Sequence, residues 1–130
     1  MKLLSVLLFP TLLFGADIDF KQSVLPRLQD RCISCHSAPY TKSGRLRKPK
    51  GDYRVDTREN IVKAGDSEKV AVVPGNASSS NLYKLILLNE DHDDIMPAKG
   101  DPLTDEQKET IKNWINQGAK WSPGIIINRE

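Results

Sequence analysis

Apolar residues recur at helical spacing near the start of the chain. Phe20, Val24 and Leu28 are each four residues apart, so their side chains would share one face of a helix. Pro26 is compatible with this helix because Ser23, as its N-cap, places the proline in the first turn, where a backbone N–H is not needed. The pattern therefore predicts a helix that ends close to residue 32.

A second amphipathic segment lies near the end of the chain and has a clear start signal. Thr104–Gln107 reads Thr-Asp-Glu-Gln, which fits a capping box in which the first and last side chains satisfy backbone N–H groups reciprocally. Ile111, Trp114 and Ile115 follow on one helical face. Gly118 is a suitable C-terminal stop. These signals predict the last helix.

The middle of the chain shows weaker patterns. Residues 37–54 are polar, contain glycine and proline, and lack apolar periodicity, which predicts a loop. A short helix is expected over residues 58–63, with Asp56 or Thr57 as its cap and Gly65 as its stop.

Residues 82–87 are apolar on most sides of a helix, which predicts a buried helix. One of the three serines at positions 78–80 can cap it. No long segment of the sequence alternates between apolar and polar residues as a half-buried strand would. The sequence therefore predicts a small all-α fold.

The first residues have the features of a secretory signal peptide. Lys2 is followed by twelve mainly apolar residues, 3–14, and then by Gly15 and Ala16. We expect cleavage after Ala16, which leaves one domain over residues 17–130 in an exported, periplasmic protein without a transmembrane span. An uncleaved anchor is the alternative, although a membrane-spanning helix needs about 20 apolar residues.

The overall charge is close to neutral. The chain has 19 Lys and Arg against 17 Asp and Glu, a formal net charge of +2. This balance gives no support for binding to nucleic acid or to a membrane surface. The chain has two cysteines, Cys32 and Cys35, and outside the cytoplasm an unused pair would be prone to form a disulfide.

The two cysteines belong to the motif Cys32–His36 (Cys-Ile-Ser-Cys-His), which has the spacing of a covalent haem c attachment site. In such a site both sulfurs bond to the haem, and the histidine binds the iron from the proximal side. A thioredoxin-like redox pair is an alternative, but no βαβ pattern surrounds the motif. A zinc site is another, but it needs four ligands, and beyond the motif only the distant His92 is available.

The second axial ligand of the iron must come from a distant part of the chain. Met96 lies between two predicted helices, and a thioether there would favour Fe(II) and raise the reduction potential, as suits an electron carrier. His92 is a competing candidate, but the carboxylates around it would keep it hydrated. An open site is the third possibility. We favour Met96, opposite His36.

The ordered series of motifs resembles the planctomycete-type cytochrome c domain, a class I-like c-type cytochrome module. The resemblance covers most of the chain after residue 16 and rests on seven blocks: Arg31 to His36, Tyr53 to Arg58, Lys63 to Ser67, Val72 to Asn76, Ser79 to Leu82, Ile95 to Pro97, and Leu103 to Trp121. It implies one covalently attached haem c bound through Cys32, Cys35, His36 and Met96, a small helical domain wrapped around it, and a role in electron transfer.

The chain departs from that family in two places. Ser37 stands where glycine is usual, and the loop over residues 40–50 is longer than usual, so its conformation cannot be carried over. Seven basic residues lie in and beside this loop, against two acidic ones: Lys42, Arg45, Arg47, Lys48, Lys50, Arg54 and Arg58. They predict transient, charge-steered docking of redox partner proteins, with a merely solvated loop as the alternative.

The sequence leaves three classes of function open. The first is an electron carrier, free or as a subunit of a larger oxidoreductase. The second is a haem peroxidase or gas sensor with an open or labile distal site. The third is a structural or metal-binding domain without haem. Met96 argues against an open site, so we expect an electron carrier with no catalytic residues.

Overall fold

The computed structural model describes residues 16–130. The predicted signal peptide, residues 1–16, lies outside the described residues apart from Ala16. None of the helices in the described part combines the length and the apolar character that crossing a bilayer requires. The assignment of residues 17–130 to one domain stays a prediction.

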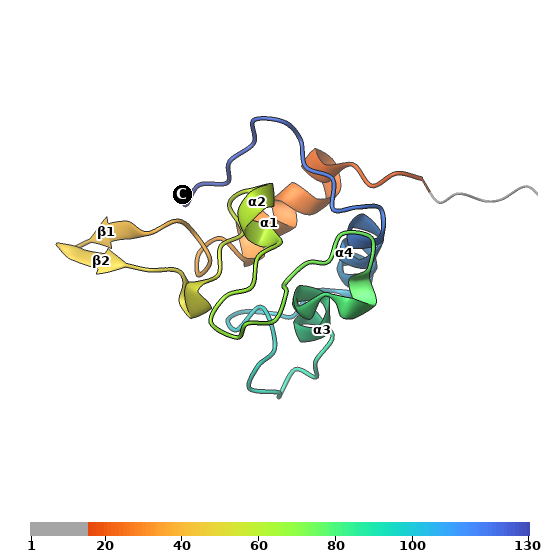
Figure 1. The fold of residues 1–130 in the computed structure, drawn as a ribbon. Coiled ribbons are helices and arrows are strands. Elements are labelled where there is room, and N and C mark those ends of the chain that lie inside the picture. The colour runs from red at the N-terminus through yellow and green to blue at the C-terminus, as the bar shows by residue number, and fades with distance from the viewer. Residues whose placement is uncertain (1–15) are drawn as a thin grey trace, which may run out of the picture.

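The described chain enters the fold through two consecutive helical segments (Figure 1). A π-helical turn over Phe20–Val24 runs directly into α1 (Leu25–Arg31). The N-cap is Asp19, whose carboxylate accepts a hydrogen bond from the backbone N–H of Gln22 at 2.9 Å. The prediction of Ser23 as N-cap is wrong because the helical path begins before it. The predicted end of the helix beside residue 32 is confirmed.

The all-α prediction is wrong, because the polar segment after the motif contains a β-hairpin (Figure 1). β1 (Tyr40–Lys42) pairs antiparallel with β2 (Arg45–Arg47). A two-residue turn joins them, with Ser43 and Gly44 at φ angles of 52° and 71°, which matches the twist of a hairpin. Most residues of both strands are exposed, so no apolar alternation marks them in the sequence. The described chain is a small mixed α/β fold.

Three short helical segments follow the hairpin along the chain. One 3₁₀ turn covers Lys50–Asp52 and another covers Ala77–Ser79. Between them lies α2 (Arg58–Ile61). Its N-cap is Thr57, whose hydroxyl oxygen accepts a hydrogen bond from the backbone N–H of Asn60 at 3.1 Å. The predicted short helix and this cap are confirmed, although the helix ends earlier than expected.

The apolar segment after position 80 forms α3 (Asn81–Ile86), as predicted. Its burial differs from the prediction, since Ile86 is buried whereas Leu87 is 49% exposed. Ser80 occupies the N-cap position without capping the helix, and its hydroxyl instead accepts a hydrogen bond from the backbone N–H of Val73 at 2.8 Å. The protein's own side chains therefore cover α3 only in part.

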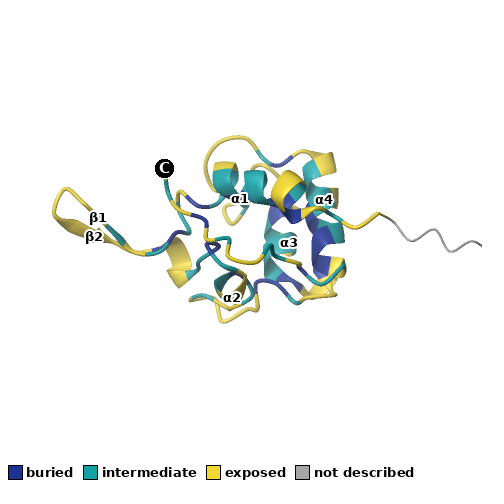
Figure 2. Ribbon diagram, turned by 90° about the horizontal axis from the view of Figure 1, so that it is seen from above, coloured by how far each residue is buried: buried dark blue, intermediate teal, exposed yellow. Residues whose placement is uncertain are grey.

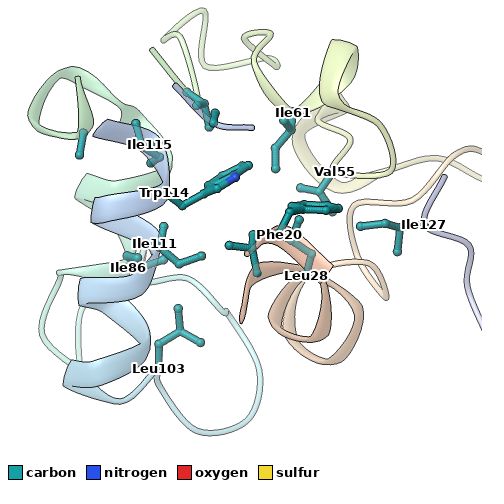
Figure 3. Close-up of a cluster of buried hydrophobic side chains, with 14 of the residues drawn as sticks. Phe20, Leu28, Val55, Ile61, Ile86, Leu103, Ile111, Trp114, Ile115 and Ile127 are labelled. Atoms are coloured by element: carbon teal, nitrogen blue, oxygen red, sulfur yellow. The ribbon is translucent and has the colours of Figure 1, made fainter. Parts of the chain in front are cut away.

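The last helix, α4 (Asp105–Asn116), begins with the predicted capping box, in which Thr104 and Gln107 exchange hydrogen bonds. Its buried face holds the three predicted residues, Ile111, Trp114 and Ile115. The Trp114 and Phe20 ring centroids lie 6.3 Å apart (Figure 3). This pair packs the last helix against the first helical turn.

The core lies where the first helical segments meet α3 and α4 (Figure 2), while the hairpin extends away from it and is exposed. Its buried apolar side chains come from distant parts of the sequence: Phe20, Val24, Leu28, Ile33, Val55, Ile61, Val72, Ala77, Ile86, Leu103, Ile111, Trp114, Ile115, Ala119 and Ile127.

The C-terminal segment returns to the motif and to the base of the hairpin (Figure 1). Ile127 is buried, and its backbone N–H donates a hydrogen bond to the Asp56 carbonyl at 2.8 Å. The guanidinium of Arg129 lies 4.1 Å from the centroid of the Tyr40 ring and donates to the Ser34 carbonyl. The tail thereby ties β1 to the segment that carries the two cysteines.

Candidate functional site

The Cys32–His36 motif folds into a compact turn at the end of α1. The backbone N–H groups of Cys35 and His36 both donate to the Cys32 carbonyl, at 3.2 and 3.1 Å. Ile33 is buried and anchors the turn to the core. Both cysteines are free thiols, and burial raises the pKa of the Cys32 thiol to about 12. The folded turn thus holds the first cysteine as a neutral thiol.

The imidazole of His36 is held in a defined orientation. Its Nδ1 lies 3.0 Å from the carbonyl oxygen of Tyr53, and the two rings meet edge to face with centroids 5.3 Å apart. Because a carbonyl oxygen only accepts hydrogen bonds, Nδ1 must carry the proton in this contact. Burial lowers the pKa of His36, which favours the neutral ring and leaves the lone pair of Nε2 free. Neutral histidine with its other nitrogen bonded in this way is a good metal ligand.

One cavity of about 240 Å³ brings together three of the four predicted site residues. Cys32 and His36 line it from the motif turn, and Met96 lines it from the loop between α3 and α4. The backbone N–H of Met96 donates to the Leu85 carbonyl at 3.3 Å, which ties this loop to α3. Cys35 is not among the described residues that line the cavity.

His92, the competing candidate for the second axial position, lies elsewhere. It is exposed, and it is not one of the described residues that line the cavity. Its Nδ1 accepts a hydrogen bond from the backbone N–H of Asp94 at 3.0 Å. Met96 is therefore better placed than His92 to reach a ligand in this cavity.

The walls of the cavity are mainly apolar, and three helices contribute to them. Leu28 belongs to α1, Leu82, Leu85 and Ile86 belong to α3, and Ile111 belongs to α4. Leu82 and Leu85 are only partly buried because their side of α3 borders the cavity. The cavity therefore accounts for the partial exposure of these two leucines, whereas Leu87 is exposed without lining the cavity. A largely apolar ligand here would complete the core.

Apart from His36, the ionisable side chains that could carry charge into this cavity are all cationic: Arg27, Arg31, Lys50 and Lys69. The described acidic residues do not line it. The sequence did not predict that these four side chains share one cavity, and Lys50 was expected only as part of the basic loop. Arg27 and Arg31 stand four residues apart in the helix before the motif, a spacing that places both on one helical face and could have indicated a shared site.

Tyr53 begins one of the blocks that carry the family resemblance, but its contact with His36 was not predicted from the sequence. Its backbone carbonyl accepts the His36 hydrogen bond, and its hydroxyl donates to the Ile61 carbonyl at 2.7 Å. Burial raises the pKa of Tyr53 far above its usual value, so the phenol stays neutral. Tyr53 therefore positions His36 and connects the motif to α2.

A family model described as Planctomycete cytochrome C matches residues 32–100, more than half of the chain. The matched span begins at the first cysteine of the motif and includes both His36 and Met96. The chain belongs to the Planctomycete cytochrome C family. Comparisons with curated proteins and with solved structures found no match.

Membership of this cytochrome family supports haem binding and electron transfer at a coarse level, and it is consistent with an electron carrier. The residues of the cavity fit a haem. The apolar walls suit the macrocycle, and the cationic side chains suit the two carboxylates that a haem carries. A neutral His36 is the form that binds iron. Arg31 Nη2 is buried and has no hydrogen-bond partner among the described residues, so the cytochrome offers a donor to an acidic group.

Proposed function

We propose that this protein is an exported monohaem c-type cytochrome that transfers single electrons between partner proteins. Haem c would be attached through Cys32 and Cys35, with His36 and Met96 as axial ligands. The observation that carries the proposal is the shared cavity, because Cys32, His36 and Met96 line the same largely apolar space. A haem iron bound there would supply one-electron exchange between Fe(II) and Fe(III).

The residues around the cavity would set the potential of that exchange. The Tyr53 carbonyl keeps the His36 proton on Nδ1 and leaves Nε2 for the iron. The Met96 thioether favours the reduced state and raises the potential. The apolar walls from α1, α3 and α4 restrict access of water, which tunes the potential further.

Covalent attachment is the first expected result. Expression with a haem-attachment system should give a protein that keeps its haem stain on a denaturing gel and has the mass of the chain plus one haem. Cys32→Ala and Cys35→Ala should each leave at most one thioether bond, and the double variant should lose the stained band. Ser34→Ala changes the same turn without removing a thiol and should keep the band.

Two outcomes would contradict this expectation. One is pigment that acid acetone extracts from the unmodified protein. The other is an intact mass equal to that of the bare chain.

In this proposal, partners dock on the basic hairpin, defined here as Lys42, Arg45, Arg47, Lys48 and Lys50. All five are exposed. Lys50 also lines the cavity, so the positive surface continues from the hairpin to the edge of the proposed haem site. Charge complementarity of this kind raises the rate of encounter with an acidic partner more than it raises affinity.

Removing charge from the hairpin should slow electron transfer. We expect the double variant Arg45→Ser with Arg47→Ser to react roughly tenfold more slowly with an acidic redox protein at low salt, since electrostatic steering contributes at least that much. The rate of the unmodified protein should fall as salt is added, because the screening length shortens to about 8 Å at physiological ionic strength. Stopped-flow mixing measures both rates.

The matched control removes two charges from the helix that lies away from the hairpin (Figure 1). Lys108→Ser with Lys112→Ser on α4 should change the rate much less. The haem spectrum should stay the same in both double variants. Rates that respond neither to salt nor to the hairpin charges would mean that these side chains only keep the loop solvated.

A further inference from the structure

Arg31 holds a buried donor that the rest of the described chain leaves unused. It is the last residue of α1 and lines the cavity directly before Cys32. Its Nη2 is buried without a hydrogen-bond partner. A buried guanidinium nitrogen without a partner is costly, more so than an unpaired neutral group. The side chain is therefore placed for a partner that is not part of residues 16–130.

The cavity indicates what that partner is. The described salt bridges do not involve Arg31, and the described acidic side chains do not line the cavity. A guanidinium binds a carboxylate through two parallel hydrogen bonds, which is its strongest common pairing. An anionic oxygen carried by the occupant of the cavity would satisfy Arg31.

We propose that the guanidinium of Arg31 binds a carboxylate of the haem and thereby raises the reduction potential of the iron. This inference rests on the proposed function. Oxidised iron carries one more positive charge than reduced iron, so an unneutralised carboxylate nearby stabilises the oxidised state. Pairing with Arg31 cancels that charge and favours reduction.

Substitutions at Gly100 offer a second way to disturb the proposed contact between Arg31 and the haem carboxylate. A Cβ placed on Gly100 would lie 3.9 Å from both Nη1 and Nη2 of Arg31. The glycine has a φ of 78°, a region in which Asp and Asn are the best tolerated of the other residues. Gly100→Asp would bring a competing carboxylate to Arg31, and Gly100→Asn would bring a neutral group of the same shape.

The test is a redox titration of the purified haem-loaded protein and its variants. Arg31→Gln removes the positive charge and should lower the potential. Arg31→Lys keeps the charge but lacks the planar guanidinium. It should restore at least half of the difference in reduction potential between Arg31→Gln and the unmodified protein. Lys21→Gln removes an exposed charge from the preceding helical turn and should leave the potential unchanged. An Arg31→Gln potential equal to that of the unmodified protein would overturn the inference, as would an equal shift in Lys21→Gln.

The two Gly100 variants test the same inference if Arg31→Gln yields no haem-loaded protein. Gly100→Asp should then have a lower potential than Gly100→Asn, and equal potentials would overturn the inference. The haem-stained gel of the unmodified protein separates the two proposals. A missing stained band would refute covalent haem attachment. A stained protein whose reduction potential does not change in Arg31→Gln would refute only the role of this arginine.

Discussion

Replacing Met96 by alanine should abolish the weak near-infrared sulfur-to-iron band of the oxidised protein. The same change should lower the reduction potential, because a ligand that favours Fe(II) is lost, and it should open the iron to carbon monoxide. The effect should be confined to the side chain. Met96 is tied to the Leu85 carbonyl through its backbone N–H, and alanine keeps that bond. Absorption spectroscopy in both redox states and a redox titration measure these changes.

The matched control for this experiment is His92→Ala. His92 is exposed and bonds within its own loop, so its loss should leave the spectrum, the potential and the carbon monoxide response unchanged. If His92→Ala removed the native spectrum while Met96→Ala had no effect, the axial pair would be two histidines. If the unmodified protein bound carbon monoxide readily, a peroxidase or gas sensor would replace the electron carrier as the better interpretation.

The largest loss of stability is expected for Trp114→Ala. Trp114 is 1% exposed and packs beside Phe20 (Figure 3), and its indole N–H donates to the Lys120 carbonyl at 2.7 Å. Truncation leaves a large cavity and an unpaired carbonyl, which together should lower the free energy of unfolding by about 3–5 kcal/mol. Domains of this size have about 5–15 kcal/mol in total. Chemical denaturation followed by circular dichroism measures the difference.

Two further variants test whether lost packing causes the drop in the free energy of unfolding of Trp114→Ala. Trp114→Phe keeps most of the buried volume and should cost less than the alanine variant. Leu46→Ala truncates a side chain that is 63% exposed on the hairpin and should change the free energy of unfolding by no more than about 0.5 kcal/mol. A loss for Trp114→Ala no larger than that for Leu46→Ala would contradict the packing described here.

The helices were predictable because their signals are local. The capping box at Thr104–Gln107 and the cap at Thr57 need only a few neighbouring residues, and the structure confirms both. The hairpin was missed because exposed three-residue strands bury no apolar face and so leave no alternation in the sequence. A local signal did exist, since Ser43-Gly44 is a dipeptide typical of turns, but without apolar flanks it does not by itself predict two strands.

Some residues of the candidate site were likewise predictable from a local pattern, and others were not. Cys32 and His36 are recognisable from the spacing of one short motif, because their chemistry is local. That Met96 would face the same cavity could only be expected from its loop and from the family resemblance. That four cations line the cavity was not predicted, because their approach to it depends on how separate segments pack: Arg27, Arg31, Lys50 and Lys69. No short-range pattern in the sequence predicts that packing.

The raised pKa of the Cys32 thiol also bears on the order in which the protein is assembled. Burial raises the pKa of this thiol to about 12, so little of it is ionised at neutral pH. The nucleophilic form needed to bond a haem vinyl group is therefore scarce once the chain has folded. In an extended chain the thiol meets water and regains its ordinary acidity. Thioether formation is thus expected to precede folding, so that the haem is enclosed as the core forms around it and does not enter a finished binding site.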